Sequence, residues 1–227
     1  MSILVAVPVK DLANAKQRLV AFLSPSERGD LARAMLEDVL EALDRAKLGP
    51  VLVVTREPEV EQLAASHGAG TLREEINLGH TEAVAHAQRA ALARGAKRFL
   101  TIPGDVPCVT PGELRALAET PMETPGAVFV PSLSGFGTNA ALLEPPDVMP
   151  LKFGEPSFDN HLVAARAAGL RPRVRRLPGI GLDVDAPDDL GLLLERGPST
   201  RSARLLVSLD VPARLARPRL ADQRPEA

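Results

Sequence analysis

The chain has little of several residue types on which particular classes of protein depend. It contains one cysteine, no tryptophan, no tyrosine and six phenylalanines among 227 residues. The single cysteine, Cys108, excludes an internal disulfide. A net charge of −2 provides no basic surface for nucleic acid, and no apolar run approaches the ~20 residues of a membrane span. We therefore expect neither nucleic acid nor a membrane as a partner.

The N-terminus also lacks the features of an export signal. Met1 and Ser2 lead directly into an apolar segment, with no basic region before it. This arrangement predicts a cytoplasmic protein. A chain of this length would bury roughly 70% of its extended surface on folding, which suffices for one sizeable core. We expect one principal domain over residues 1–196.

Apolar segments typical of strands alternate with segments typical of helices. Ile3 to Val9 is apolar without alternation, as in a strand that is covered on both faces. Ser24-Pro25-Ser26-Glu27 matches the capping-box pattern and predicts a helix over 25–46. Strands are also expected at 51–55, 98–102, 127–131 and 174–177, and helices at 58–66, 81–94, from 110, at 157–169 and at 187–195. This alternation predicts an α/β domain with a mostly parallel, twisted sheet flanked by helices.

Two regions depart from this alternation. Between Ser132 and Ser157 the periodicity breaks down around a short apolar run, Ala140 to Leu143, and we interpret this stretch as a site-forming insertion. Residues 197–227 are rich in proline, arginine and serine and are predicted to form a C-terminal extension. A short amphipathic helix is expected there at 203–209, and the residues after Ala216 are expected to be mobile.

Three cations follow the first predicted strand. Lys10, Lys16 and Arg18 lie where open α/β sheets bind ligands, beyond the carboxyl ends of the strands. A polyanion would suit this cluster. The alternative is a solvated basic loop, since long cationic side chains are usually exposed.

Acidic residues occur at two distant points of the chain. Asp105 follows Gly104 at the end of a predicted buried strand, where a carboxylate is unfavourable unless it is paired or bound to a metal. Asp183 and Asp185, if extended, would face the same side and could share one hard divalent cation. The alternatives are a turn or helix cap for Asp105 and ordinary loop acids for the other two. Taken together, the three carboxylates predict a metal site.

A set of small polar residues lies within the predicted insertion. Thr138, Asn139, Gly154 and Ser157 could present hydroxyl, amide and backbone donors to a phosphate or carboxylate, particularly if Ser157 begins a helix. Turns use the same residue types, so a purely structural role stays open.

Three other features are interpreted as structural. Gly135 to Ala140 matches G-x-G-x-x-A, but the dinucleotide fingerprint requires a long helix next, and Pro145-Pro146 cuts the following apolar run short. His80 and His86 are six apart and would not share a helix face, so the histidines are expected at the surface or at helix caps. Cys108 is expected to be a small buried filler.

Six short motifs, taken in order, resemble a known family. They are Pro8-Val-Lys10, Ala15-Lys-Gln-Arg-Leu19, Pro103-Gly-Asp-Val-Pro107, Gly137-Thr-Asn139, Phe153-Gly-Glu-Pro-Ser-Phe158 and Leu182-Asp-Val-Asp185. The set covers about residues 3–196 and is similar to the CofC/FbiD family of 2-phospho-L-lactate or phosphoenolpyruvate guanylyltransferases. The resemblance implies a nucleotide-diphospho-sugar transferase-like, Rossmann-like fold related to the molybdopterin guanylyltransferases. It also implies a part in the biosynthesis of the deazaflavin coenzyme F(420).

The same resemblance implies roles for individual residues. The carboxylates that look like metal ligands, with Mg²⁺ as the expected ion, are Asp105, Asp183 and Asp185. The residues that look like binders of a three-carbon phosphorylated acid are Thr138, Gly154 and Ser157. The segment Asn77 to Thr81 departs from the Gly-Leu-Asn-like segment expected ahead of the third helix, and it is predicted to face the nucleotide.

The function predicted on this basis is the transfer of GMP from GTP to the phosphate of phosphoenolpyruvate or 2-phospho-L-lactate, with release of pyrophosphate. The acceptor oxygen would attack the α-phosphorus in line, so no side-chain nucleophile is required. Mg²⁺ would offset the repulsion between the two polyanionic substrates. Lys10, Lys16 and Arg18 are assigned to the triphosphate and the leaving pyrophosphate.

Two other functions fit parts of the sequence. A glycosyltransferase, or another sugar or acid nucleotidyltransferase of similar fold, would also use Asp-x-Asp and a metal, although the chain lacks the tryptophan and tyrosine common in sugar sites. A non-catalytic nucleotide-binding regulator would keep the cleft without turnover. The sequence does not determine the oligomeric state, and a homodimer is compatible with it.

Overall fold

One seven-stranded sheet runs through the protein, whose computed structural model describes residues 2–12, 15–76 and 78–216. The strands are β1 (Ile3–Pro8), β2 (Val51–Thr55), β3 (Gly70–Arg73), β4 (Arg98–Thr101), β5 (Gly126–Pro131), β6 (Thr138–Glu144) and β7 (Arg173–Val174). The helices are the 3-10 helix η1 (Gln17–Leu19), α1 (Pro25–Ala46), α2 (Pro58–Ser66), α3 (His80–Ala93), α4 (Pro111–Ala118), α5 (Ser157–Ala167), α6 (Pro178–Gly181), α7 (Pro187–Arg196), α8 (Arg201–Ser208) and α9 (Val211–Ala216). In the part of the chain that the structure describes, no helix has the length and apolar character needed to cross a membrane.

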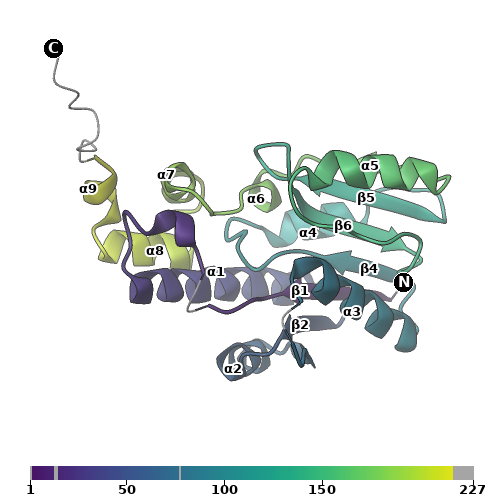
Figure 1. Ribbon diagram of the computed structural model, residues 1–227, viewed down its shortest axis with the longest axis horizontal. Helices are drawn as coiled ribbons and strands as arrows, with labels where there is room; N and C mark the ends of the chain where they lie inside the picture. Colours follow the sequence, from purple (N-terminus) through teal and green to yellow (C-terminus); the bar gives the residue numbers. More distant parts are fainter. Residues whose placement is uncertain (1, 13–14, 77, 217–227) are drawn as a thin grey trace, which may run out of the picture.

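The sheet is mostly parallel and contains one reversed strand. Its strand order is β3-β2-β1-β4-β6-β5-β7 (Figure 1). Strands β3, β2, β1 and β4 run parallel, whereas β6 runs antiparallel to its neighbours β4 and β5. At the far edge, β7 pairs parallel with β5. The predicted α/β fold with a mostly parallel sheet is therefore confirmed.

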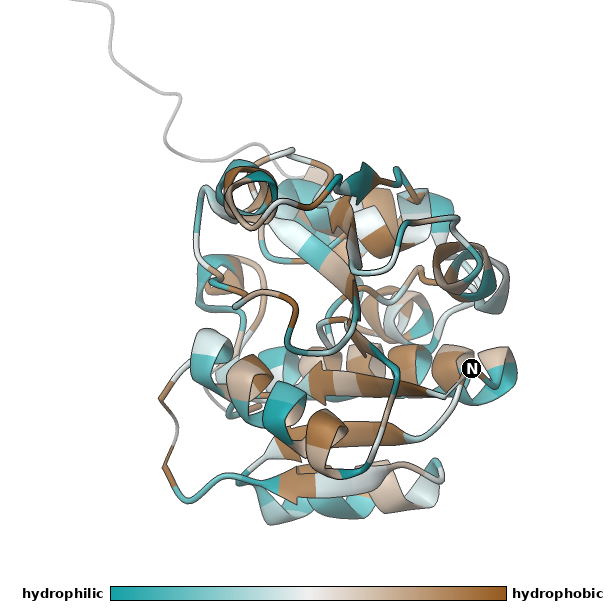
Figure 2. Ribbon diagram, turned by 90° about the vertical axis from the view of Figure 1, so that its right-hand side faces the viewer, coloured by the Kyte–Doolittle hydropathy of each residue, from teal (hydrophilic) through white to brown (hydrophobic). Residues whose placement is uncertain are grey.

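Helices cover both faces of the sheet, and β1 shows how its sequence fits this position. The side chains of Val5 and Val7 belong to an apolar cluster that includes Leu36 of α1. Leu4 and Ala6 belong to a second cluster, which includes residues of α3 and α5. Figure 2 shows the apolar strands enclosed between helices. Because both faces are buried, β1 shows no alternation of apolar and polar residues.

Strand β6 is the main difference between the sequence-based expectation and the structure. The interpretation of residues 132–157 as an insertion is wrong for 138–144, which form a strand inside the sheet. Ala140 to Leu143 are all buried, so this strand lacks the polar alternation that would indicate it. The strand expected at 174–177 is wrong for 175–177, because β7 consists of Arg173 and Val174. The four-residue β3 was not predicted, since its side chains are only partly buried or exposed.

The C-terminal helices pack against α1. Leu206 of α8 and Val211 of α9 lie in an apolar cluster with Met35 of α1 and Leu190 of α7. The amphipathic helix expected at 203–209 corresponds to α8. The residues after Ala216, which are expected to be mobile, lie outside the described residues.

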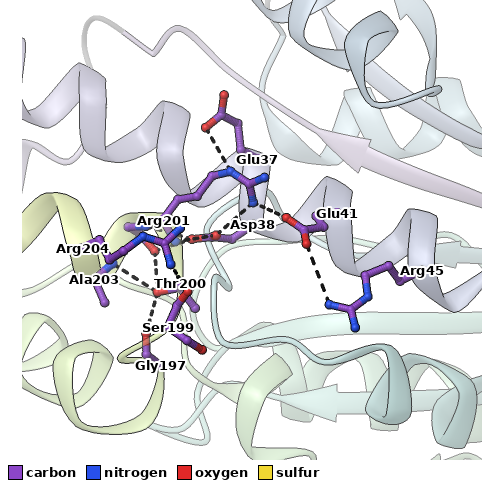
Figure 3. A network of polar contacts seen from close by, with 11 residues as sticks. Glu37, Asp38, Glu41, Arg45, Gly197, Ser199, Thr200, Arg201, Ala203 and Arg204 are labelled. Carbon is purple, nitrogen blue, oxygen red and sulfur yellow. Dashed lines mark hydrogen bonds and ion pairs between the residues drawn. The ribbon is translucent and has the colours of Figure 1, made fainter.

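A polar network fixes the start of α8 on α1. The Asp38 carboxylate accepts hydrogen bonds from the backbone N–H groups of Arg201 at 2.8 Å and Ser202 at 3.0 Å. Figure 3 shows Glu37, Asp38 and Glu41 of α1 around the Arg201 guanidinium, with which all three form ion pairs. The Asp38 carboxylate thus satisfies N–H groups that the first turn of a helix leaves unpaired.

Two neighbouring positions of α8 test whether this helix stabilises the domain. Leu206 is fully buried, whereas Val207 is 61% exposed. Leu206→Ala is expected to lower the free energy of unfolding by about 2–5 kcal/mol, because it leaves a cavity against α1. Val207→Ala should change it by less than about 0.5 kcal/mol. Urea unfolding followed by circular dichroism would measure both, and equally small effects would show that α8 contributes nothing to domain stability.

Candidate active site

A pocket of about 310 Å³ lies at the edge of the sheet where β1 and β4 end. Lys10 and Lys16 come from the segment after β1, and Gly104 and Asp105 come from the segment after β4. His80, at the start of α3, completes the polar wall. Ligands of open α/β sheets bind beyond the carboxyl ends of the strands, and this pocket occupies such a position.

Lys16 joins two acidic segments that are far apart in the sequence. Its Nζ donates to Asp105 Oδ2 at 2.6 Å and to Asp185 Oδ1 at 2.7 Å. The Val184 N–H also donates to the Asp105 carbonyl at 3.1 Å, so the two segments meet through their backbones. The structure thus brings Asp105 and Asp185 together around one cation.

The charges of this group stabilise one another. The Lys16 side chain is only 7% exposed, and burial by itself favours the neutral forms of both Lys16 and Asp105. The attraction between them prevails, because the pKa of Asp105 lies below its ordinary value and the pKa of Lys16 lies above its own. Both groups are therefore charged at neutral pH.

Asp183 has a different partner. Asn139 Nδ2 donates to Asp183 Oδ1 at 3.0 Å and to two backbone carbonyls of α6 at 2.9 and 3.1 Å. Asn139, which is predicted to bind the phosphorylated acid, therefore contacts Asp183, one of the three acids predicted to bind a metal. Burial raises the pKa of Asp183, the charges of Asp105 and Asp185 raise it further, and the bond from Asn139 opposes them. A carboxylate held in such surroundings beside a pocket is a candidate functional group.

Asp189 holds the turn that carries Asp185. Its Oδ2 accepts hydrogen bonds from the backbone N–H groups of Asp185 at 2.9 Å and Ala186 at 2.7 Å. Asp189 therefore caps the start of α7. The side chain of Asp185 extends to Lys16 instead.

Two of the three acids predicted to bind a metal converge on an ammonium group. Among residues 2–12, 15–76 and 78–216, no three His, Cys, Asp or Glu side chains are arranged to hold a metal ion. The Lys16 ammonium bridges Asp105 and Asp185 instead. The three acids offer only carboxylate oxygens, the ligand type that a hard divalent ion such as Mg²⁺ prefers, but the Lys16 ammonium occupies the position between two of them. Magnesium binding stays a prediction.

The other predicted cations differ in their relation to the pocket. Lys10 is exposed and lines it, whereas Arg18 is exposed on η1 and is not among the lining residues. Gly104 lines the pocket and also lies against a side chain of α1. A Cβ at this position would lie 3.2 Å from Leu36 Cδ1. A larger residue here would therefore be in tight contact with α1.

A second polar cluster joins β6 to α5. The Thr138 N–H donates to Ser157 Oγ at 3.0 Å, and Thr138 Oγ1 lies 2.9 Å from His161 Nδ1. His161 Nε2 accepts a hydrogen bond from the Lys152 N–H at 2.9 Å. Gly154, in the intervening loop, has a left-handed φ of 114°, and the space beside its Cα is open. Thr138 and Ser157, both predicted to bind the phosphorylated acid, thus lie in direct contact.

A row of aromatic rings connects this cluster to the pocket. The His161 ring stacks on Phe129 with 5.4 Å between centroids and meets Phe153 edge to face at 5.2 Å. Phe153 in turn meets His80 at 4.4 Å. The Phe153 N–H also donates to Thr81 Oγ1 at 3.0 Å, which holds the loop against the start of α3. The pocket and the second cluster are therefore neighbours.

Sequence reasoning did not identify His161. The expectation that the histidines lie at the surface or at caps is wrong for this residue, which is 2% exposed. A signal was present, because His161 lies four residues after Ser157 and so shares a face of the predicted helix. His80 is the first residue of α3, after the N-cap Gly79, and it lines the pocket. Asn77, in the segment predicted to face the nucleotide, lies outside the described residues.

Two of the features interpreted as structural, Gly135 to Ala140 and Cys108, have such roles in the described chain. Gly135 to Ala140 leads into strand β6 and not into a helix, so it is not a dinucleotide fingerprint. Cys108 is partly buried against the cluster formed by α1, α7 and α8. Burial raises the pKa of its thiol to about 11, so little reactive thiolate is present at neutral pH.

Comparison with known proteins identifies the family. A model of the family described as guanylyl transferase CofC like matches residues 1–221. A phosphoenolpyruvate guanylyltransferase of Rubrobacter xylanophilus is 43% identical over 197 residues, covering 87% of this chain and 96% of that protein. A 2-phospho-L-lactate guanylyltransferase of Methanobrevibacter smithii is 28% identical over 205 residues, covering 90% of this chain and 89% of that protein. The crystal structure of a candidate nucleotide-diphospho-sugar transferase from Desulfovibrio desulfuricans G20 has a TM-score of 0.74 at 19% identity, covering 94% of this chain and 98% of that one.

The chain belongs to the CofC-like guanylyl transferase family and is a nucleotidyltransferase. The resemblance carried by the six short motifs is therefore confirmed. The structural likeness confirms the nucleotide-diphospho-sugar transferase-like fold. The family assignment favours a nucleotidyltransferase over the glycosyltransferase and regulator alternatives.

Two histidines, the partly buried His80 and the buried His161, predict a loss of stability in acid. Burial lowers the pKa of His80 and of His161 to about 4. An unfolded histidine titrates near pH ~6.5, so the unfolded chain binds more protons than the folded chain between about pH 6.5 and pH 4. The contribution to stability is complete above this window and falls as the pH decreases through it.

His161→Asn isolates one of these contributions. It should reduce the decline in unfolding free energy between pH 7 and pH 4 by at most about 3 kcal/mol, because the titrating ring is gone. Urea unfolding at a series of pH values would measure the slope, and His67→Asn serves as a control outside the site. A wild-type slope in the His161 variant would contradict the prediction.

Proposed function

We propose that the protein transfers GMP from GTP to the phosphate group of phosphoenolpyruvate or 2-phospho-L-lactate and releases pyrophosphate. The observation that carries this proposal is the family assignment, with relatives named for these two acids. The relative with 43% identity is named for phosphoenolpyruvate, which makes this acid the first acceptor to test. The activity would contribute to the phosphate-linked side chain of the deazaflavin coenzyme F(420).

The chemistry requires that two polyanions meet. An oxygen of the acceptor phosphate attacks the α-phosphorus of GTP in line, and the new P–O bond forms as the bond to pyrophosphate breaks. The enzyme needs no nucleophile for this step, so positioning and neutralisation of charge are its main tasks. Two unit charges ~4 Å apart repel by about 1 kcal/mol in water and by more in a partly buried pocket.

The pocket beyond β1 and β4 is the proposed nucleotide site. Lys10 and Lys16 line this pocket and are proposed to neutralise the triphosphate and the leaving pyrophosphate. Arg18, on the neighbouring η1, is proposed as a third cation for the same phosphates. His80 lies in the wall of the pocket with its ring held by Phe153, in a position to contact the nucleotide.

The acidic group beside this pocket is proposed to hold Mg²⁺. Its ligands would be the carboxylates of Asp105, Asp183 and Asp185. Support comes from the Lys16 Nζ, which lies within hydrogen-bond distance of two of them. When bound, the ion would neutralise negative charge on phosphate oxygens.

The cluster at the start of α5 is proposed to bind the phosphorylated acid. Thr138 and Ser157 contribute hydroxyl groups, and Gly154 leaves open space beside the backbone. The first turn of α5 has no side-chain cap, so the helix N-terminus can add to the attraction for an anion. Because Phe153 touches both this cluster and His80, the two proposed sites adjoin.

An assay of pyrophosphate release tests the proposal. The purified chain would be mixed with Mg²⁺, each nucleoside triphosphate and, in turn, phosphoenolpyruvate, 2-phospho-L-lactate, 3-phosphoglycerate and a set of sugar phosphates. Release with GTP and phosphoenolpyruvate or 2-phospho-L-lactate, together with the guanylylated acid by mass spectrometry, is the expected result. Release only with sugar phosphates would contradict the acceptor, and tight GTP binding without release would favour a regulator.

Asp183→Asn tests the acidic group. Asparagine keeps the oxygen that accepts from Asn139 but removes a charge that burial and neighbouring acids destabilise. The melting temperature should therefore stay the same or rise, while turnover falls on the order of a hundredfold or more. Asp188→Asn, at an exposed position of α7, is the matched control and should keep wild-type turnover. Wild-type turnover in the Asp183 variant would remove this residue from the site.

A further inference from the structure

His161 is buried, and both of its ring nitrogens are engaged. Nε2 accepts from the backbone N–H of Lys152 at 2.9 Å, and Nδ1 lies 2.9 Å from Thr138 Oγ1. Stacking on Phe129 and the edge contact with Phe153 fix the plane of the ring. The hydrogen-bond partners of the two nitrogens are thus a backbone N–H and a hydroxyl, neither of which is charged.

These contacts determine which nitrogen carries the proton. A backbone N–H can only donate, so Nε2 of His161 must be the acceptor. A neutral imidazole then carries its hydrogen on Nδ1, and this N–H donates to Thr138 Oγ1. Burial lowers the pKa of His161 to about 4, which keeps the ring neutral near pH 7.

The fixed tautomer determines what the Thr138 hydroxyl can do. Because its oxygen accepts from His161, its own proton is directed to another partner. The Ser157 hydroxyl is committed in the same way. Its Oγ accepts from the Thr138 N–H at 3.0 Å, so its own proton is left to donate. Two adjacent hydroxyls that both donate suit an anion, because carboxylate and phosphate oxygens only accept.

We propose that His161 is a positioning residue that commits the Thr138 hydroxyl to donate to the phosphorylated acid. This inference rests on the proposed function, in which the acid binds at the start of α5. His161 acts through Thr138 and does not touch the substrate. Its bond to Lys152 serves to orient the ring and to fix the tautomer.

Two substitutions separate the contacts of the ring. The side-chain amide introduced by His161→Asn can place an N–H near the position of Nδ1 and so can still donate to Thr138. His161→Gln reaches the position of Nε2 and can keep the bond to Lys152, but it loses the donor to Thr138. His67→Gln, at the end of α2, is a control outside the site.

Steady-state kinetics with GTP and phosphoenolpyruvate distinguish the two contacts. His161→Gln is expected to raise the KM for the acid about tenfold, with the KM for GTP unchanged. His161→Asn should raise the KM for the acid less than about threefold. The double variant Thr138→Val, His161→Gln should have a KM for the acid no higher than that of Thr138→Val alone, because His161 acts through Thr138. Equal effects of the Asn and Gln variants on the KM for the acid, or no effect of either, would overturn the proposal.

The tautomer itself gives a readout that does not depend on turnover. Long-range ¹H–¹⁵N spectra of the wild-type protein at pH 7, assigned by the signals lost in His161→Asn, should show a protonated Nδ1 and an unprotonated Nε2. A protonated Nε2 would overturn the proposal even if both variants fold poorly. If the wild-type protein uses none of the tested acids, the proposed function fails, whereas the spectra still decide the state of His161.

Discussion

The candidate site depends on the Lys16 ammonium group, which is held between Asp105 and Asp185. A charge removed from water is unfavourable unless an opposite charge compensates it. Lys16 meets this requirement with two carboxylates, while its side chain is 7% exposed. Its partners follow β4 and precede α7, and Lys16 itself follows β1. One group of charges therefore joins three distant segments at the edge of the pocket.

The balance of charge in this group has a consequence for ligands. The Lys16 ammonium contacts the carboxylates of Asp105 and Asp185, and the charges of these two also act on Asp183. Three carboxylates therefore share the surroundings of one ammonium, and negative charge is in excess. The raised pKa of Asp183 expresses this excess, since burial and its acidic neighbours both disfavour the ionised form. An additional cation would relieve the repulsion, which is the physical reason for proposing Mg²⁺ here. The cations Lys10 and Arg18 lie toward solvent, where they can meet a polyanion.

The reversed strand β6 explains why the second cluster adjoins the first. Because β6 runs antiparallel to β4, its first residues lie at the edge where β4 ends. Thr138 and Asn139 are thereby delivered to the same edge as Asp105. Thr138 then forms hydrogen bonds with Ser157 and His161 of α5, while Asn139 forms one with Asp183. A parallel strand in this position would have placed its first residues at the opposite edge of the sheet.

The sequence by itself determined the features that depend on neighbouring residues and on short motifs. The capping box at Ser24 placed α1, the apolar run from Ile3 placed β1, and the motifs identified the family. Only the tertiary structure decided that Lys16 bridges the carboxylates, that Asn139 contacts the acidic group, and that His161 is buried. These contacts join residues far apart in the chain, and they follow from strand order and register, which local patterns do not encode for a strand buried on both faces.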